Sequence, residues 1–269
     1  MYKKDLNNLI DYKKSYLCIT LNYTEEEIKC FGQDMSVYDF IKKIIDTTSE
    51  YVVAYRLSGE FYQTHDMFDV FEKIISYINK KQVLLLVDFL GQKLLFEFYN
   101  QKGEPLLSEN IRKMPRRMSL VLNLIREDTP DFVLKDPEDI NKQNMILTIL
   151  GKKDANSDFT ELYRCLKDIK NIYDPKESII DYIFIVNDMD DIQYARQIFT
   201  DDFVIMNNII TQNQLMYCIY ENMTRKNWGV IIDDTDQIIV NSPDFFGSIF
   251  IKTKEIQENM ESIITLLTK

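Results

Sequence analysis

The sequence predicts an α/β fold with a parallel, Rossmann-like sheet in its C-terminal half, on the strength of three observations. Apolar strand-like runs alternate with amphipathic helical segments most regularly from about Ser178 to the end of the chain, as in βαβ units on a parallel sheet. The chain has 269 residues, 45% of them hydrophobic, enough for a sizeable core. It contains only seven Gly and six Pro, so we expect no long flexible linker.

Short runs rich in Val, Ile, Phe and Tyr and bounded by turn residues are predicted as strands. They cover residues 16–23, 51–57, 83–88, 94–99, 182–187, 203–207, 230–233 and 248–252. Apolar residues spaced three and four apart predict the helices. The helical segments are residues 37–49, 67–78, 120–126, 141–150, 159–172, 192–199, 212–223 and 254–267.

These elements divide the chain into three expected portions. Residues 1–100 form an N-terminal α+β portion, in which 84–99 reads as two strands joined at Gly91-Gln92, the pattern of an antiparallel hairpin. Residues 101–177 have little strand signal and five of the six prolines lie between 100 and 181, which predicts a helical insertion. Residues 178–269 form the C-terminal Rossmann-like portion.

Charge and composition exclude several classes of function. A net charge of −11 argues against binding a nucleic-acid backbone with the whole surface. The one dense basic cluster, residues 112–117, is a solvated turn or helix start by default, and the alternative is a local anionic partner. The four cysteines are scattered, as expected of free thiols in a reducing compartment. His65 is the only histidine, which rules out sites that need two.

The sequence predicts a soluble, cytoplasmic protein that does not enter a membrane. No apolar run approaches the length of about 18 residues that a membrane span needs. The first residues, Met-Tyr-Lys-Lys-Asp-Leu, are too polar for a signal peptide.

Polar side chains end three of the predicted strands and are the candidate functional residues. Asp88 ends one strand, Asn187 ends another, and Asp233 and Asp234 follow an apolar run near the C-terminus. Ligands of open α/β sheets bind outside the carboxyl ends of the strands, and carboxylates there can hold Mg²⁺. If the three strands are parallel neighbours, these groups converge. The alternative for Asp233 and Asp234 is a polar turn after a buried strand.

In this order, the three strand ends resemble the motifs of the haloacid dehalogenase-like superfamily of phosphohydrolases. Asp88-Phe-Leu-Gly-Gln keeps the first Asp and the Gly of that family's Asp-x-Asp-Gly-Thr motif, and Asn187 stands where the family has Ser or Thr. Asp233-Asp234 followed by Gly247 is similar to the family's acidic motif. The chain departs from the family at Leu90, which replaces the second Asp, and no third-motif lysine is evident.

The resemblance implies two competing functions. In a divergent phosphohydrolase or phosphotransferase, Asp88 would attack phosphorus, Asn187 would orient a phosphate oxygen, and Asp88, Asp233 and Asp234 would hold Mg²⁺. In a non-catalytic interaction or regulatory protein, the same fold would bind a partner protein or a small phosphorylated ligand. Leu90 and the missing lysine favour the non-catalytic interpretation, because general acid–base help is typically worth about 10²–10⁴-fold in rate. The retained Asp233-Asp234 pair favours the enzyme.

Overall fold

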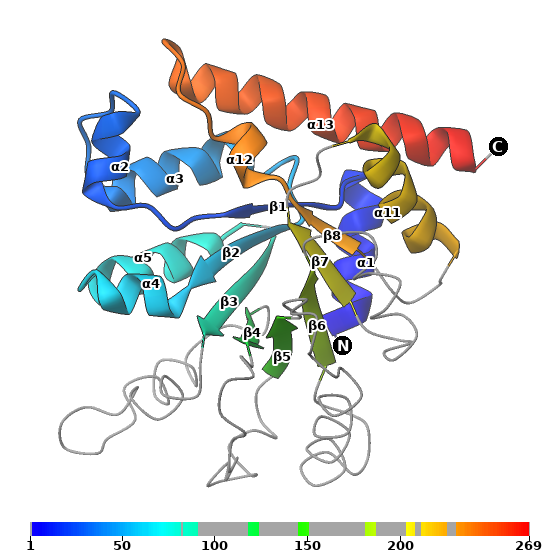
Figure 1. Cartoon of the computed structure of the whole chain (residues 1–269), viewed down its shortest axis with the longest axis horizontal. Helices are drawn as coiled ribbons and strands as arrows, with labels where there is room; N and C mark the ends of the chain where they lie inside the picture. Colours follow the sequence, from blue (N-terminus) through cyan, green and yellow to red (C-terminus); the bar gives the residue numbers. More distant parts are fainter. Residues whose placement is uncertain are drawn as a thin grey trace, which may run out of the picture.

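The strands close into a barrel in the computed structural model of this chain (Figure 1). All eight strands are parallel and follow one another around the barrel in chain order, and β1 pairs with β8 to complete the ring. The strands are β1 Leu17–Thr20, β2 Ala54–Ser58, β3 Leu84–Leu90, β4 Met118–Asn123, β5 Met145–Leu150, β6 Asp181–Val186, β7 Phe203–Asn207 and β8 Val230–Asp233. The structure describes residues 2–81, 83–90, 118–123, 145–150, 181–186, 203–207, 211–224 and 230–268.

Helices cover the outside of the barrel, as Figure 1 shows for α3, α5 and α13. Helix α3 packs against both α5 and α13, and α13 also contacts α11. The described helices are α1 Tyr2–Lys13, α2 Glu25–Cys30, α3 Val37–Thr48, α4 Gly59–Thr64, α5 Phe68–Ile78, α11 Gln212–Thr224, α12 Thr235–Ile238 and α13 Phe245–Leu267. This arrangement of strands and helices is that of a TIM barrel.

Local sequence explains where two of these helices begin. The Ser36 hydroxyl accepts a hydrogen bond from the Asp39 N–H at 3.1 Å and so caps α3. Thr24 and Glu27 form a reciprocal capping box at the start of α2. In α3 the apolar face predicted from the sequence is buried, together with Thr48. The 3.6-residue period therefore identified the core-facing side of this helix correctly.

The alternation of side chains along β2 distinguishes the inside of the barrel from the outside. The Tyr55 hydroxyl lies 2.7 Å from that of Thr48 on α3, so Tyr55 faces the helices. Neighbouring side chains of a strand point to opposite faces, which places Arg56 inside the barrel. In β1, Thr20 pairs in register with Arg56 of β2. Cys18, two residues earlier in β1, pairs with Asp233 of β8. These side chains therefore share the interior face.

An aromatic cluster joins the helices above the carboxyl end of β1. The rings of Phe31 and Phe245 lie 4.9 Å apart between centroids, and those of Phe40 and Phe245 lie 5.4 Å apart. Phe31 follows α2, Phe40 belongs to α3 and Phe245 is the first residue of α13. The cluster holds these three elements together at the end of the barrel where β1 and β8 finish.

The structure corrects the predicted sheet. The α/β class and the parallel strands are confirmed, but the Rossmann-like open sheet is wrong because β8 pairs with β1 and leaves no edge. The strand expected over 248–252 lies inside α13. The helices expected over 120–126 and 141–150 overlap β4 and β5, so apolar runs taken for helix are strands. Short, mostly apolar runs such as these fit either state when periodicity alone is used.

Strands predicted over 203–207 and 230–233 have those same bounds in the structure. The elements expected over 94–99, 159–172 and 192–199 lie outside the described residues. All three expected portions, 1–100, 101–177 and 178–269, contribute strands to the one barrel.

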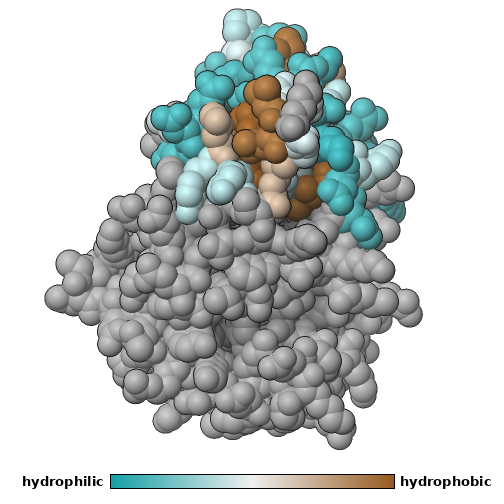
Figure 2. All heavy atoms as spheres, turned by 90° about the vertical axis from the view of Figure 1, so that its right-hand side faces the viewer, coloured by the Kyte–Doolittle hydropathy of each residue, from teal (hydrophilic) through white to brown (hydrophobic). Residues whose placement is uncertain are grey.

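The outer surface of α11 and of the C-terminal part of α13 is mixed in character. Figure 2 shows a small apolar area there, bordered by hydrophilic side chains. Exposed apolar residues of these helices include Met216, Leu266 and Leu267. Among the described helices, none combines the length and apolar character that crossing a bilayer requires.

Candidate active site

A cavity of about 450 Å³ lies at the carboxyl ends of β1, β2 and β8. In TIM barrels this is the end where active sites are built, from strand ends and the loops that follow them. Residues at the strand ends form the floor of the cavity, and residues of the following loops and short helices form its mouth. Its lining residues within the described part of the chain are Thr20, Asn22, Tyr23, Glu27, Phe31, Arg56, Asp233, Thr235, Asp236 and Ile239.

Asp233, the last residue of β8, is held on the floor by two hydroxyl groups. Thr20 donates to one carboxylate oxygen, Oδ2, at 2.5 Å, and the Thr235 hydroxyl donates to the other, Oδ1, at 2.5 Å. The Thr235 oxygen in turn accepts the Thr20 backbone N–H at 2.7 Å. With only 6% of Asp233 exposed, these bonds replace water for a buried carboxylate. They also fix the loop after β8 against the end of β1.

Arg56 supplies the positive charge of the floor. Its Nη1 lies 3.6 Å from Asp233 Oδ2, and only 14% of the Arg56 side chain is exposed. The pair joins β2 to β8 across β1. An ion pair inside a barrel is less screened than one at the surface, so the Arg56 guanidinium presents a directed positive field to a ligand in the cavity.

The loop after β1 is fixed by hydrogen bonds to the last residue of β2 and to α4. The Asn22 side-chain oxygen accepts the Ser58 N–H at 2.9 Å. The buried Tyr62 hydroxyl, on α4, donates to the Leu21 carbonyl. Asn22, in the loop after β1, and Arg56, in β2, therefore reach the cavity from segments that these hydrogen bonds hold together.

The mouth of the cavity combines apolar surfaces with two carboxylates. Tyr23 and Phe31 present aromatic surface from the loop after β1 and the end of α2, and Ile239 adds an apolar side chain from the segment after α12. Glu27 on α2 and Asp236 on α12 are both exposed. Burial and the nearby carboxylates raise the pKa of the Tyr23 hydroxyl far above its usual range, so it stays protonated.

Asp234 follows Asp233 but belongs to a different environment. It is 5% exposed, and its Oδ1 has no hydrogen-bond partner among the described residues. Burial, reinforced by the charges of Asp233 and Asp236, raises the pKa of the Asp234 carboxyl to about 7. Asp234 is not among the residues that line the cavity.

The strands that carry the predicted site residues are not adjacent in the barrel. Asp88 lies in β3, where it pairs in register with Ser58 and Val121, so β1 and β2 separate its strand from that of Asp233. The strands that end near Asp88, Asn187 and Asp233 are parallel members of one sheet, but the expectation that they are neighbours is wrong. Asn187 and the side chain of Asp88 lie outside the described part of the structure.

The magnesium site expected at Asp88, Asp233 and Asp234 stays a prediction. Among the described residues, no group of three or more His, Cys, Asp and Glu side chains is placed to hold a metal ion. Both oxygens of Asp233 already accept hydrogen bonds from threonine hydroxyls.

Sequence patterns had not marked Thr20, Asn22 or Arg56 as functional. Each lies at or near the carboxyl end of β1 or β2, and the only available signal was a polar side chain ending an otherwise apolar run. Arg56 interrupts Tyr51-Val-Val-Ala-Tyr-Arg-Leu, a run in which it is the one charged residue.

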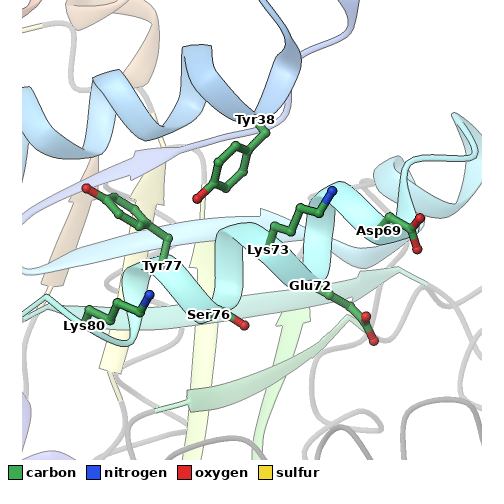
Figure 3. A pocket seen from close by; sticks show the side chains of 7 residues that line it. All are labelled: Tyr38, Asp69, Glu72, Lys73, Ser76, Tyr77 and Lys80. Carbon is green, nitrogen blue, oxygen red and sulfur yellow. The ribbon is translucent and has the colours of Figure 1, made fainter.

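A second cavity, of about 350 Å³, lies on the outside of the barrel between α3 and α5 (Figure 3). Tyr38 points from α3 toward α5, and Lys73 and Tyr77 point from α5 toward α3. Its remaining lining residues, Asp69, Glu72, Ser76 and Lys80, are polar. Because it lies away from the strand ends, it provides matched surface positions for control variants.

Comparison with known proteins connects part of the chain to one group of enzymes. The chain is 35% identical to orotidine 5′-phosphate decarboxylase of Porphyromonas gingivalis over 85 residues, which is 30% of this chain and 31% of that relative. It is 33% identical to orotidine 5′-phosphate decarboxylase of Phocaeicola vulgatus over 84 residues, again 31% of the relative's length. No protein-family model matches the chain.

Solved structures match along the whole chain. Orotidine 5′-monophosphate decarboxylase of Plasmodium berghei superposes with a TM-score of 0.68 at 13% identity, with all of both chains covered. Orotidine 5′-monophosphate decarboxylase of Leishmania donovani gives 0.62 at 12% identity, covering 98% of this chain and 99% of that one. At these identities the likeness concerns the fold. The fold is a TIM barrel.

These findings overturn the haloacid dehalogenase-like resemblance. The short motifs behind it, at Asp88, Asn187 and Asp233, sit on three separated strands of a closed barrel, and the similar proteins are decarboxylases. The two functions that depended on it, a magnesium-dependent phosphohydrolase and a non-catalytic protein on a degenerate version of that fold, fall with it. The segment after Gly247, expected to return to the sheet as a strand, continues as helix α13.

Proposed function

We propose that this chain is a decarboxylase of the orotidine 5′-phosphate decarboxylase type, acting on a pyrimidine ribonucleoside that carries a carboxylate on its ring. The observation that carries the proposal is the local identity of 35% to a protein with that activity. The whole-chain likeness to barrels of the same type and the position of the cavity at the carboxyl ends of the strands support it.

The chemistry asks for a positive group beside the reacting carbon. Decarboxylation breaks the bond between the ring carbon and the carboxylate carbon, releases CO₂, and leaves an electron pair on the ring carbon that then takes a proton. A fixed cation stabilises that developing charge most effectively in a site with little water. Arg56 is suited to this task because it is mostly buried and held by Asp233 at 3.6 Å.

Arg56 is not suited to deliver the proton, because a guanidinium stays charged in proteins. Among the residues of the cavity wall that the structure describes, none is a lysine or a histidine. The proton that replaces CO₂ therefore comes from water, from a hydroxyl group or from a residue beyond this wall. Asn22 and the threonine hydroxyls offer hydrogen bonds for the ring and ribose.

The test measures release of labelled CO₂ from carboxyl-labelled orotidine and orotidine 5′-phosphate, with binding followed by calorimetry. We expect binding and turnover by the wild type and loss of both in Arg56→Met. Lys73→Met, which removes a cation from the outer α3–α5 cavity, should behave as the wild type. No binding of either compound, or equal binding and turnover by Arg56→Met, would overturn the proposal.

A further inference from the structure

The Thr20 hydroxyl stands between the two charged groups on the floor of the cavity. Thr20 pairs in register with Arg56, and its strand, β1, separates β2, which carries Arg56, from β8, which carries Asp233. Across this arrangement the Thr20 hydroxyl donates to Asp233 Oδ2 at 2.5 Å. The same carboxylate oxygen lies 3.6 Å from Arg56 Nη1. Thr20 and Arg56 therefore approach one oxygen from the same side.

The distance between Arg56 and Asp233 is that of an ion pair without a direct hydrogen bond. A hydrogen bond from a charged nitrogen to a carboxylate is about 2.7–2.9 Å long, whereas Nη1 and Oδ2 are 3.6 Å apart. Each oxygen of Asp233 already has a donor, because Thr20 bonds to Oδ2 and Thr235 bonds to Oδ1. The guanidinium therefore stays near its counter-ion without having to satisfy it.

Given the proposed function, on which this inference rests, we propose that Thr20 is a positioning residue. Its hydroxyl keeps Arg56 from closing onto Asp233, and so holds the guanidinium where the charge on the reacting ring carbon develops. Without the hydroxyl, the buried Oδ2 loses a donor, and Arg56 is a charged donor within reach. Closing from 3.6 Å to about 2.8 Å strengthens the attraction by about tenfold in equilibrium constant at an effective dielectric constant of about 20.

The first test measures release of labelled CO₂ from carboxyl-labelled orotidine and orotidine 5′-phosphate by Thr20→Val, which loses only the hydroxyl donor. We expect kcat to fall by roughly 10–100-fold, because a displacement of about 1 Å beside a reacting group has an effect of this size. KM should change little, because the lost effect concerns the transition state. Thr20→Ser returns the hydroxyl and should recover most of the rate.

The matched control is Thr253→Val, which removes another buried hydroxyl. Thr253 lies on α13, is fully buried, and donates to the Ile249 carbonyl at 2.7 Å. It has no part in the cavity wall that the structure describes. The control should therefore keep the wild-type kcat and KM, even where losing the hydrogen bond lowers the stability of the chain.

The second test needs no substrate. The coupling between Arg56 and Asp233 is measured by urea unfolding of Arg56→Met, Asp233→Asn and the double variant, once in the wild-type background and once with Thr20→Val. Without the hydroxyl the coupling should be about tenfold stronger in equilibrium constant, and Thr253→Val should leave it unchanged. A Thr20 hydroxyl with only a structural role would lower stability and leave the coupling as it is. Thr20→Ala takes the place of Thr20→Val should the valine variant not fold.

The two tests separate this inference from the proposed function. Turnover by the wild type, together with a coupling that Thr20→Val does not strengthen, would refute the positioning role and leave the proposed function standing. A raised KM at unchanged kcat would also refute it, because Thr20 would then contact the ligand directly. Equal losses in Thr20→Ser and Thr20→Val would refute it as well, since packing would be the cause. Stronger coupling without turnover by the wild type would overturn the proposed function and keep the hold of Thr20 on Arg56.

Discussion

The Arg56 guanidinium lies 3.6 Å from the Asp233 carboxylate, joining β2 to β8 across the intervening strand β1. The two residues are far apart in sequence and meet only because the sheet closes. Both are largely buried, so the pair contributes to stability as well as to the candidate site.

Arg56→Met should lower the free energy of unfolding by about 3–5 kcal/mol, because it leaves Asp233 buried without its counter-ion. Asp233→Asn should cost less, since one threonine hydroxyl can still donate to the amide oxygen and the oxygen of the other can accept from the amide nitrogen. Urea unfolding of both single variants and the double variant gives the coupling energy. The exposed pair Lys42–Asp46, at 3.7 Å, is the control, and Lys42→Met should change stability by less than about 1 kcal/mol. Additive effects at positions 56 and 233 would contradict the coupling.

Asp234→Asn should stabilise the protein at pH 8. Burial and the neighbouring carboxylates raise the folded pKa of the Asp234 carboxyl from 3.8 to about 7. The protonated Asp234 carboxyl contributes its whole stabilisation below about pH 4, and this contribution is lost as the pH rises through 7. Unfolding free energies of both proteins at pH 4, 6 and 8 test this. The free energy of unfolding that Asp234→Asn adds should grow with pH. An increase that is constant across this range would refute the raised pKa of the Asp234 carboxyl.

Lys13 should give the opposite pH dependence. It is 8% exposed, its ammonium donates to the Ser49 carbonyl at 2.5 Å and the Val52 carbonyl at 2.8 Å, and burial lowers its pKa to about 8. Between pH 8 and 10.5 the unfolded chain binds more protons there, so stability linked to Lys13 rises with pH. Between pH 7 and 9.5, the free energy of unfolding of the wild type should therefore rise relative to that of Lys13→Met, as measured by urea unfolding. A constant difference would show that Lys13 titrates normally.

Phe40→Ala should cost about 3–5 kcal/mol, because it opens a cavity in the aromatic cluster that joins α2, α3 and α13. Phe40 is fully buried, and its ring contacts those of Phe31 and Phe245. Phe250, 40% exposed on α13, is the control, and its replacement by Ala should cost about 1 kcal/mol or less. Thermal and urea unfolding would measure both, and equal losses would place the cluster outside the core.

The sequence was informative wherever a local period decides the structure. The face of α3 from Val37 to Ile45 and the last two strands followed from spacing alone. The closure of the sheet did not, because pairing of Leu17 with Ile232 leaves no local trace. The site was missed in part for the same reason. Asp233 stands beside Asp234, and two adjacent acids form a pattern that is visible in the sequence. Its partners Thr20 and Arg56 come from strands far away in the chain.

The pairing of β1 with β8 also has a consequence for the newly made chain. As synthesis proceeds from the N-terminus, β1 emerges more than two hundred residues before the strand that covers its open side. Until β8 arrives, the backbone N–H and C=O groups along that side of β1 are available to any extended segment, including one from another copy. The finished ring offers no such row. The period of greatest risk of aggregation is therefore the interval between translation of β1 and that of β8, and it ends when one short strand, Val230–Asp233, joins the sheet.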